Sequence, residues 1–404
     1  MASTKLTRTH GTATNTKKYT WSAWIKRGNI GTQETLVRTR TSDTNYARFR
    51  TDPDKLEFTD TISGSQITQL ISNEKLKDSN AWYHVVLKVD YTQASAADRA
   101  KIYLNGSEVS YATATRPSQD SNSFFNSANG HAIGTYNDNH YFFGAMSHVH
   151  FTDGYAYDAS TFGSTDATTG EWKINTAPSV TYGTNGYFIL KDANGVTDQS
   201  GNSNNFTVGG GTLTTLQDNP SNNFSTLNTR IRTSGGAFSQ VMNTFTDTSG
   251  SYQTGFSSQG MLNGQGKYYA EFKVVSGSSL LFGIADYKDG GVIDRIQQGQ
   301  TRYLGEYSNS YGYQRSGLFY YNGSSTGTNY DSFTTNDIIG MAVDMDNLKI
   351  YWHKNGTYQN SKNPASNNGE TIVAPEEAYH MGISCESSVA NANFGNGIFG
   401  TTAI

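Results

Sequence analysis

The amino-acid sequence predicts an all-β protein made of two β-sandwiches. Short runs of alternating, β-branched and aromatic residues follow one another along the chain, separated by clusters of Asn, Gly, Asp and Ser. The chain has 42 Gly but 6 Pro, and aromatic residues, including 26 Tyr, make up 13% of it. Disordered chains are poor in aromatic residues, so this composition indicates a folded, turn-rich protein.

Length and charge exclude several classes of protein. A chain of 404 residues is long enough for two or three domains. Its net charge of −4 gives no general attraction to nucleic acid or to a membrane surface. No apolar run reaches the length of a membrane span, and the N-terminal stretch MASTKLTRTHGTATN lacks the apolar core of a secretory signal. The single cysteine, Cys385, excludes an intrachain disulfide and is expected to be a buried, inert thiol.

The predicted strands are runs in which apolar and polar side chains alternate or β-forming residues gather. They cover residues 19–28, 82–91, 99–109, 141–154, 185–195, 266–277, 280–287, 337–356 and 378–385. Helical patterns are confined to two short stretches, 94–100 and 158–163, each about two turns long at most.

Two predicted hairpins have similar sequences, KIYLNG (101–106) and LKIYWHKNG (348–356). Each places an alternating strand before an Asn-Gly pair, a strong signal for a two-residue hairpin turn. The side chains expected to face the cores are those of Ile102, Leu104, Ile350 and Trp352. His353 lies on the opposite face and is expected to be packed or solvated rather than catalytic. The flanking residues do not align, so one architecture is used twice without a tandem repeat.

Residues 158–228 are rich in Thr, Asn, Gly and Ser and predict an ordered connector between the two sandwiches. Long loops in compact proteins are usually functional or packed by their own side chains. The triplet NNF occurs twice in this region, and we expect its Phe206 and Phe224 to anchor otherwise polar loops.

Ordered motifs mark both halves of the chain. The first half contains YTWSAWIKRG, NEKLKDSNAWYHVVLKVD, AKIYLNGSEV and GAMSHVHFTDGYAYDASTFG. In that order they resemble the laminin-G-like or concanavalin-like jelly-roll family, over residues 1–165. The second half contains GKYYAEFKV, LLFGIAD, SYGYQRSGLFYYNG, DIIGMAVDMDNLKIYWHKNG and ANFGNG. These motifs resemble a SPRY domain, which is also a concanavalin-like sandwich. The predicted boundaries are therefore 1–165, 166–229 for the connector, and 230–404.

The connector stretches GTNGYFILKDANGVTDQSGNSNNFTV and DNPSNNFSTLN resemble a linker in structural proteins of marine tailed phages. In such proteins a laminin-G-like module, this linker and a SPRY-like module often occur together. The resemblance implies a lectin-like virion protein of the tail-fibre or capsid-fibre kind, assembled in the host cytoplasm and exposed on the virion surface. It implies other virion proteins as partners and a homo-oligomer, with a trimer favoured. Neither a nucleic-acid partner nor membrane insertion is expected.

Concanavalin-like sandwiches include glycan hydrolases, which need two carboxylates on one strand face, about 5 Å apart in retaining enzymes. The pattern is absent, since no Glu is followed by Asp two residues later. Asp344 and Asp346 share a strand face, but a hairpin turn explains them better than an acid pair or a metal site. No nucleophile elbow, phosphate loop, Cys-x-x-Cys or His-Glu-x-x-His pattern occurs. We therefore expect no enzyme activity.

Metal sites are weakly indicated. His148 and His150 share a predicted strand face, but zinc needs three or four ligands and no third is near, so a packed or interface pair is favoured. The stretches open to calcium binding are TYNDNH (135–140), TDG (152–154) and DYKDGG (286–291). Ordinary Asx turns also explain them. No cofactor is expected, with calcium as the one alternative.

Two Tyr-rich loops are the predicted ligand sites, because sugars are bound by aromatic faces together with polar donors and acceptors. The first supplies Tyr136, Asn137, Asp138, His140 and Tyr141. The second supplies Tyr303, Tyr307, Tyr311, Tyr313 and Arg315. Tyr offers a large contact area and a hydroxyl at low entropic cost. For both loops, contact with a glycan or receptor, contact between subunits and burial in a strand core remain open.

The predicted function is structural and adhesive: several copies on a particle would turn weak contacts with a host-surface glycan or receptor into strong attachment. Two alternatives stay open. One is a purely architectural capsid or tail component with no host ligand. The other is a glycan depolymerase, which the missing carboxylate pattern opposes.

Overall fold

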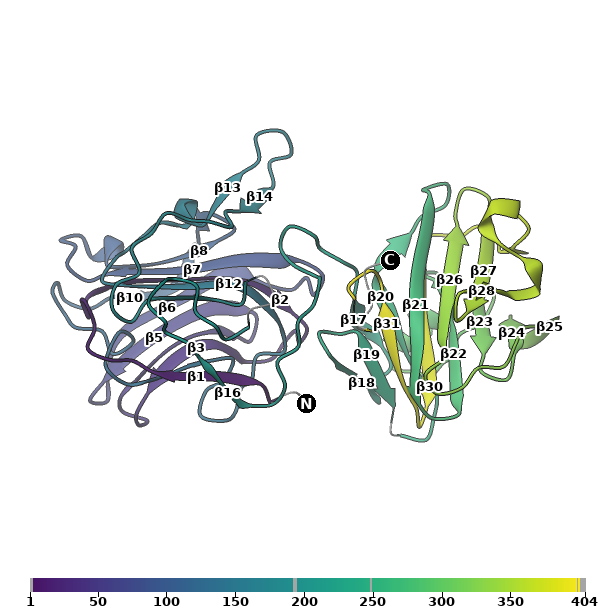
Figure 1. Ribbon diagram of the computed structural model, residues 1–404, viewed down its shortest axis with the longest axis horizontal. Helices are drawn as coiled ribbons and strands as arrows, with labels where there is room; N and C mark the ends of the chain where they lie inside the picture. Colours follow the sequence, from purple (N-terminus) through teal and green to yellow (C-terminus); the bar gives the residue numbers. More distant parts are fainter. Residues whose placement is uncertain (1–2, 192–194, 248, 398, 400–404) are drawn as a thin grey trace. The chain divides into compact units, whose positions relative to one another are not determined.

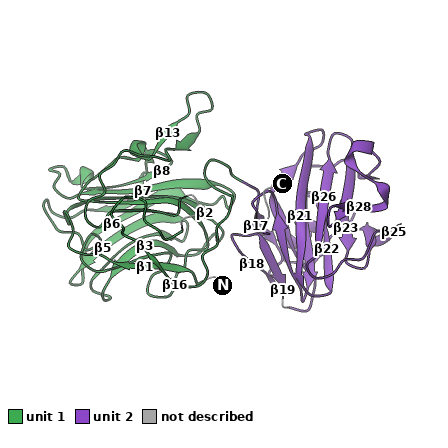
Figure 2. Ribbon diagram, in the orientation of Figure 1, with its two compact units in different colours: residues 1–223 green, residues 224–404 purple. Residues whose placement is uncertain are grey.

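The computed structural model describes residues 3–191, 195–247, 249–397 and 399. Its described residues form 31 strands, one short α-helix and four 3₁₀ turns, so the all-β class is confirmed. The chain divides into two compact units, residues 1–223 (unit 1) and 224–404 (unit 2), coloured separately in Figure 2. The expected boundaries differ from this division, because residues 166–223 belong to unit 1 and residues 224–229 to unit 2.

Unit 1 is a sandwich of two large sheets with a small third sheet, β13-β14 (Figure 1). The eight-stranded sheet has the order β10-β6-β5-β4-β3-β11-β1-β16, and the six-stranded sheet has the order β15-β12-β2-β7-β8-β9. The bounds are β1 (Lys5–Thr9), β2 (Lys18–Arg27), β3 (Glu34–Arg40), β4 (Tyr46–Asp52), β5 (Lys55–Ile62), β6 (Ser65–Lys75), β7 (Trp82–Asp90), β8 (Ala100–Leu104), β9 (Ser107–Glu108), β10 (Tyr111–Thr115), β11 (Gly130–Ile133), β12 (Gly144–Asp153), β13 (Gly163–Thr165), β14 (Trp172–Ile174), β15 (Tyr187–Ile189) and β16 (Thr207–Gly210).

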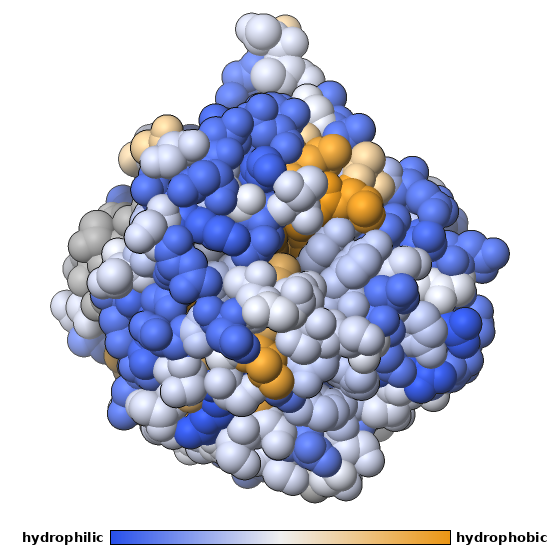
Figure 3. All heavy atoms as spheres, turned by 90° about the vertical axis from the view of Figure 1, so that its right-hand side faces the viewer, coloured by the Kyte–Doolittle hydropathy of each residue, from blue (hydrophilic) through white to orange (hydrophobic). Residues whose placement is uncertain are grey.

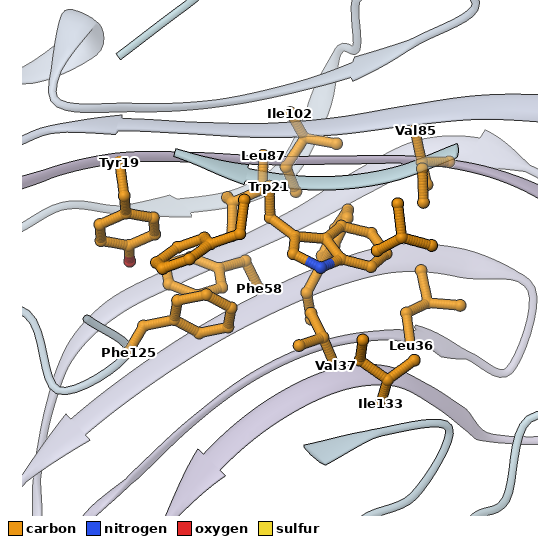
Figure 4. Packing of buried hydrophobic residues seen from close by; sticks show 14 of the residues in the cluster. Tyr19, Trp21, Leu36, Val37, Phe58, Val85, Leu87, Ile102, Phe125 and Ile133 are labelled. Carbon is orange, nitrogen blue, oxygen red and sulfur yellow. The ribbon is translucent and has the colours of Figure 1, made fainter. Parts of the chain in front are cut away.

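Alternation places side chains from the long strands of both sheets, such as β2, β5 and β7, in the core between the sheets of unit 1 (Figure 4). Trp21 of β2 meets Phe49 of β4 edge to face, with ring centroids 5.7 Å apart. Both side chains are fully buried. Burial of a large apolar side chain stabilises the fold by about 1.5–3 kcal/mol, so each of these two rings contributes substantially to the stability of unit 1.

The predicted connector completes both sheets of unit 1 instead of forming a separate body. Strand β15 pairs with β12, and β16 pairs with β1. Phe206, just before β16, is 4% exposed and belongs to the core, which confirms its expected role as an anchor. Strand β15 lies within the predicted strand 185–195, whereas β16 was missed because it is only four residues long.

Unit 2 is a second antiparallel sandwich. One sheet has the order β17-β20-β30-β22-β23-β24-β25, and the other has the order β18-β19-β31-β21-β26-β27-β28, with β29 paired to β27. The bounds are β17 (Leu227–Arg232), β18 (Gly236–Ser239), β19 (Thr244–Asp247), β20 (Gln253–Met261), β21 (Lys267–Ser276), β22 (Ser279–Asp286), β23 (Ser310–Gln314), β24 (Leu318–Tyr321), β25 (Ser324–Asn329), β26 (Ile338–Asp344), β27 (Lys349–Lys354), β28 (Thr357–Tyr358), β29 (Glu370–Thr371), β30 (Tyr379–Glu386) and β31 (Val389–Asn393). Phe272 of β21 and Phe282 of β22 stack across the two sheets, with centroids 5.0 Å apart.

Both Asn-Gly pairs form the expected two-residue hairpin turns, between β8 and β9 and between β27 and β28. The φ angles are positive at Asn105 (47°), Gly106 (84°), Asn355 (50°) and Gly356 (85°). This is the geometry of a type I′ turn, which only Gly and Asn adopt readily. Ile102, Ile350 and Trp352 are buried as predicted, while Leu104 is half-buried against the core.

The two stretches predicted to be helical do not form α-helices. The stretches 94–100 and 158–163 form only the 3₁₀ turns Ala96–Asp98 and Ala159–Thr161. The α-helix α1 (Val292–Gln297) was missed, because six residues are too few to show a helical period. No helix in the described ranges is long and apolar enough to span a membrane. Cys385 is buried as expected, and burial raises the pKa of its thiol to about 12.

Candidate ligand-binding surfaces

The first predicted loop lies between β11 and β12 and has a rigid tip. The backbone N–H groups of Tyr136 and Asn139 each donate to the carbonyl oxygen of the other at 3.0 Å. Asn137 and Asp138 lie between them with φ angles of 49° and 59°, which is again the type I′ geometry. Asn137, Asp138 and His140 are exposed at this tip.

The ring of Tyr136 lies over two arginines from neighbouring strands. The guanidinium carbon of Arg48 on β4 is 4.9 Å from the ring centroid, and that of Arg40 on β3 is 5.6 Å away. Tyr46 meets Tyr136 edge to face, with centroids 5.8 Å apart. These cation–π contacts fix the ring on the sheet, so the loop and the strands form one surface.

That surface is the outer face of the eight-stranded sheet. In the β3–β4 register, Arg38 stands opposite Arg48 and Arg40 stands opposite Tyr46. The residues between them, including Val37 and Phe49, belong to the core, so the arginines point away from it. We call Arg38, Arg40, Arg48, Tyr46 and Tyr136 the arginine face.

The loop tip is tied to this sheet by polar contacts. Asp138 forms an ion pair with Lys5 of β1, and the Lys5 ammonium lowers the pKa of Asp138. Arg40 donates to the side-chain oxygen of Asn137 at 3.4 Å. The half-buried Tyr141 also lowers the pKa of Asp138, through a side-chain hydrogen bond. The structure thus brings the first group of predicted residues together.

The arginines of this face were missed by the sequence analysis, although a signal for them exists. In VRTRTSDTNYARFR (37–50), arginines recur at every second position on both sides of the polar stretch SDTN. That spacing places the side chains on one face of a hairpin. Alternating arginine on a strand is easily taken for ordinary solvent exposure, and nothing local shows that a loop 90 residues later covers it.

The second predicted loop was partly wrong. Tyr311 and Tyr313 lie on strand β23, where they are 4% and 0% exposed. The Tyr313 ring packs edge to face on Trp352, with centroids 5.3 Å apart. Their side chains belong to the core of unit 2, so they offer no surface to a ligand. Arg315 follows β23, is half-buried, and donates to the Thr334 hydroxyl at 3.0 Å.

Tyr303 and Tyr307 are half-buried in the turn before β23. Arg295 lies 4.6 Å from the Tyr307 ring centroid, and Arg302 lies 5.7 Å from it. Tyr303 packs on Tyr252, with centroids 5.4 Å apart. A smaller aromatic and cationic surface therefore exists in unit 2, built from two of the five predicted residues.

The comparisons with known proteins agree with this architecture. Residues 2–161 match the family described as the concanavalin A-like lectin/glucanases superfamily, and residues 267–371 match the SPRY domain. The chain is an all-β protein with a concanavalin A-like domain followed by a SPRY domain.

Solved SPRY structures are similar to part of the chain. The SPRY domain of human HERC1 is 15% identical with a TM-score of 0.33, over 41% of this chain and 96% of that one. A human SPRY domain is 16% identical with a TM-score of 0.30, over 39% and 94%. The TRIM65 PSpry domain is 11% identical with a TM-score of 0.31, over 42% and 91%. No curated protein matches the chain.

The calcium candidates are held by internal hydrogen bonds. In the concanavalin A-like domain, Asp153 accepts from the backbone N–H groups of Thr14 (2.8 Å) and Asn185 (2.9 Å) and from the Asn126 amide (2.7 Å). In the SPRY domain, Asp286 accepts from the backbone N–H of Glu376 at 2.6 Å. Across the described ranges, no three His, Cys, Asp or Glu side chains gather in a way that could hold a metal ion.

The histidine pair of β12 is interrupted by a bulge. The β12–β2 register shifts between Ser147 and His150, and His148 has a φ of 49°, so strict alternation fails there. His150 stacks on Phe188, with centroids 3.9 Å apart, and its Nδ1 bonds the Tyr182 hydroxyl. This packing agrees with the favoured interpretation of a packed pair.

A serine–histidine pair is buried in the concanavalin A-like domain. The Ser22 hydroxyl lies 2.9 Å from Nε2 of His84, and the Trp172 indole N–H donates to Nδ1 of His84 at 3.0 Å. Burial lowers the pKa of His84 to about 3, so the ring is neutral. Because Nδ1 accepts, Nε2 carries the proton and donates to Ser22. The ring therefore cannot take the Ser22 proton, as a nucleophile pair requires.

Large hydrophobic residues are sparse on the surface. On the side drawn in Figure 3 most of the area is hydrophilic, and the hydrophobic patches are small and separate. Among the residues that the structure describes, the exposed large hydrophobic ones are Tyr155, Val208, Leu213, Leu262, Val275 and Val373. Single exposed residues of this kind are normal on soluble domains. Polar and cation–π contacts are therefore the main recognition chemistry that these surfaces offer.

Proposed function

We propose that the protein is a non-catalytic structural protein on the surface of a tailed-phage particle and that it adheres to host-surface glycans through the β11–β12 loop. The observation that carries this proposal is the Tyr136 ring fixed on the arginine face beside the exposed side chains of Asn137, Asp138 and His140. The ring offers a flat apolar surface to a sugar, and its polar neighbours offer hydrogen bonds to hydroxyl groups.

The rigidity of this loop supports binding. The type I′ turn and the contacts of Tyr136 with two arginines hold the tip before any ligand arrives. A preorganised site loses less conformational entropy on binding. Several copies in a homo-oligomer, with a trimer favoured, would add avidity to a weak single site.

The placement on a phage particle, with other virion proteins as partners, rests on the resemblance of the connector and on the order of the two domains. The absence of catalysis is supported by the missing carboxylate pattern and by the tautomer of His84, whose Nδ1 accepts from Trp172.

We expect Tyr136→Ala to weaken glycan binding by about 10-fold or more, because it removes the aromatic surface of the site. Binding is measured with the full chain on an array of host-derived glycans and then by interferometry. Tyr155→Ala is the matched control, because Tyr155 is an exposed tyrosine of the same unit outside the arginine face. Equal losses in the two variants would contradict the assignment of this loop.

Other outcomes would replace the proposal. If the wild-type chain binds neither host glycans nor host cells, the function is architectural. If it releases reducing ends from host polysaccharide, the protein is a depolymerase. Immunogold electron microscopy of particles tests the location separately, and a chain absent from the virion surface would contradict it.

A further inference from the structure

We infer that the arginine face binds oxyanions carried by a saccharide, so that the ligand of the proposed adhesion is an anionic polysaccharide bearing carboxylate or sulfate groups. This inference rests on the proposed function and narrows it to a class of ligand. It is carried by the pairing of Arg38 with Arg48, by the lack of a carboxylate in direct contact with either described side chain, and by their unused hydrogen-bond donors.

The pairing places like charges side by side. Arg38 and Arg48 are directly opposite on β3 and β4 and point to the same face. Directly opposed like charges destabilise a pair of strands. Burial lowers the pKa of both arginines, which shows that their charge is partly desolvated. An anion that joins both guanidinium groups would offset this repulsion.

The protein supplies this counter-charge only from a distance, through Asp138 for Arg38 and Glu57 for Arg48. The neighbouring carboxylates are already bound to other cations, namely Asp43 to Arg40 (2.7 Å), Asp52 to Arg50 (2.6 Å), Glu57 to Arg50 (2.8 Å) and Asp138 to Lys5. Within the described part of the chain, no carboxylate forms an ion pair with Arg38 or Arg48. Of the described basic residues gathered here, Arg38 and Arg48 are therefore the two without a directly paired carboxylate.

Their donors are also largely unused. Arg48 makes no hydrogen bond to any described residue, and Arg38 makes one of 3.3 Å to the carbonyl oxygen of Gly130. The Nε atoms of both are buried without a hydrogen-bond partner. A guanidinium group is a planar fork of donors that matches the oxygens of a carboxylate or a sulfate group.

The tyrosines hold the Arg48 fork in place. The Arg48 guanidinium carbon lies 5.3 Å from the Tyr46 ring centroid and 4.9 Å from that of Tyr136. In these contacts the guanidinium carbon of Arg48 lies over the rings, so the N–H donors at the edge of the group can bind an oxyanion. Tyr136 and the loop tip can then contact the sugar ring. An acidic sugar unit has both features, so it fits this surface better than a neutral sugar or an isolated anion.

The test measures binding of the full chain to polygalacturonate, dextran sulfate and neutral dextran by interferometry. We expect the carboxylated or the sulfated polymer, or both, to bind at least about 10-fold more tightly than dextran, and the two charged arms show which oxyanion is preferred. Arg48→Gln should remove most of this preference, and Arg48→Lys should restore part of it, because it keeps the charge but loses the fork. Raising the salt from about 50 mM to about 500 mM should weaken wild-type binding more than Arg48→Gln binding.

Arg116→Gln is the matched control, because Arg116 also lies over a tyrosine ring of unit 1, 5.0 Å from the centroid of Tyr111. It directly follows β10, which β6 and β5 separate from β4 in the same sheet. The Arg116→Gln variant should leave binding unchanged. Arg48→Gln removes the repulsion with Arg38 but also two cation–π contacts, so the two effects on stability oppose each other and we expect a small change in melting temperature. A melting temperature close to that of the wild type shows that lost binding is not a folding defect.

Each remaining outcome overturns the inference in a recognisable way. If dextran and the charged polymers bind equally and Tyr136→Ala abolishes both, glycan adhesion stands and the anionic class falls. If Arg116→Gln weakens binding as much as Arg48→Gln, the preference is general electrostatics. If duplex DNA binds as tightly and Arg48→Gln weakens it equally, the face binds polyanions of any kind. If no polysaccharide binds, the inference and the proposed function fall together.

Discussion

Asp218→Ala should lower the free energy of unfolding of unit 1 by about 3–5 kcal/mol, because it breaks a fully buried ion pair from one side. The Asp218 carboxylate accepts from the Lys26 ammonium at 2.6 Å and from the Trp82 indole N–H at 2.8 Å. The side chains of Lys26 and Asp218 are both 0% exposed. The variant leaves a buried ammonium without its carboxylate and an indole N–H without its acceptor.

This ion pair anchors the end of the former connector to the sandwich. Asn223 accepts from the same Lys26 at 2.8 Å and donates to the carbonyl oxygen of Asn80 at 2.9 Å. Burial lowers the pKa of Lys26 despite the carboxylate, which shows that desolvation is the larger influence. Once the carboxylate is gone, the Asn223 hydrogen bond and the more distant Asp78 remain, but the largest influence that opposes desolvation is lost.

Urea unfolding of the full chain, followed by tryptophan fluorescence, measures this effect. Four of the five tryptophans lie in unit 1, so the signal reports mainly on its unfolding. Lys173→Ala breaks the exposed pair with Asp166 and should cost less than about 1 kcal/mol. The double variant Lys26→Met/Asp218→Leu should recover most of the stability, because apolar side chains tolerate burial. A loss in Asp218→Ala no larger than that of Lys173→Ala would contradict the anchoring role.

Strands were predictable where the local sequence alone determines the structure. Alternation and the Asn-Gly turns located the β27–β28 hairpin, and Trp352 is buried as expected. The merging of the connector with unit 1 was not predictable, because it depends on long-range contacts: β15 pairs with β12, β16 pairs with β1, and Lys26 meets Asp218, which lies 192 residues later. A long-range ion pair leaves no periodic trace in either segment.

The candidate site also has a part that the sequence predicts and a part that depends on strand pairing. The β11–β12 loop was found because exposed Asn and Asp beside Tyr form a local signal. Tyr311 and Tyr313 were placed in a loop although SYGYQ itself alternates, and that alternation puts both rings on one face of β23. The arginine face depends on register: Arg38 and Arg48 become neighbours only through the pairing of β3 with β4. Sequence spacing gives the face of each strand but not its partner.

Asp60→Asn should remove a pH-dependent destabilisation of unit 1. Asp60 is 0% exposed and accepts from the Ser123 hydroxyl at 2.6 Å and from the backbone N–H of Phe124 at 3.2 Å. Burial raises the pKa of Asp60 to about 7, although these hydrogen bonds oppose the rise. Desolvation therefore has a larger effect than the bonds that favour the carboxylate.

The sign of the pH effect on stability follows from the difference in the pKa of Asp60 between the folded and unfolded states. Between the unfolded pKa of 3.8 and the folded pKa of about 7, the native state binds the Asp60 proton and the unfolded state does not. Stability from this group is therefore lost as the pH rises through that window. The shift corresponds to about 4 kcal/mol at most, and we expect about 2–4 kcal/mol in practice. Asn cannot ionise, so the variant should match the wild type near pH 4 and exceed it in stability near pH 8.

The measurement is the difference in unfolding free energy between Asp60→Asn and the wild type at several pH values, from tryptophan fluorescence in urea. Using the difference cancels the buried histidines, such as His10, whose pKa burial lowers to about 3 and whose effect on stability has the opposite sign. Asp120→Asn changes a carboxylate in an exposed pair with Lys17 and should give a small, nearly flat difference. If the Asp60→Asn curve runs parallel to the wild-type curve from pH 4 to pH 8, Asp60 is ionised throughout and its hydrogen bonds, not desolvation, determine its state.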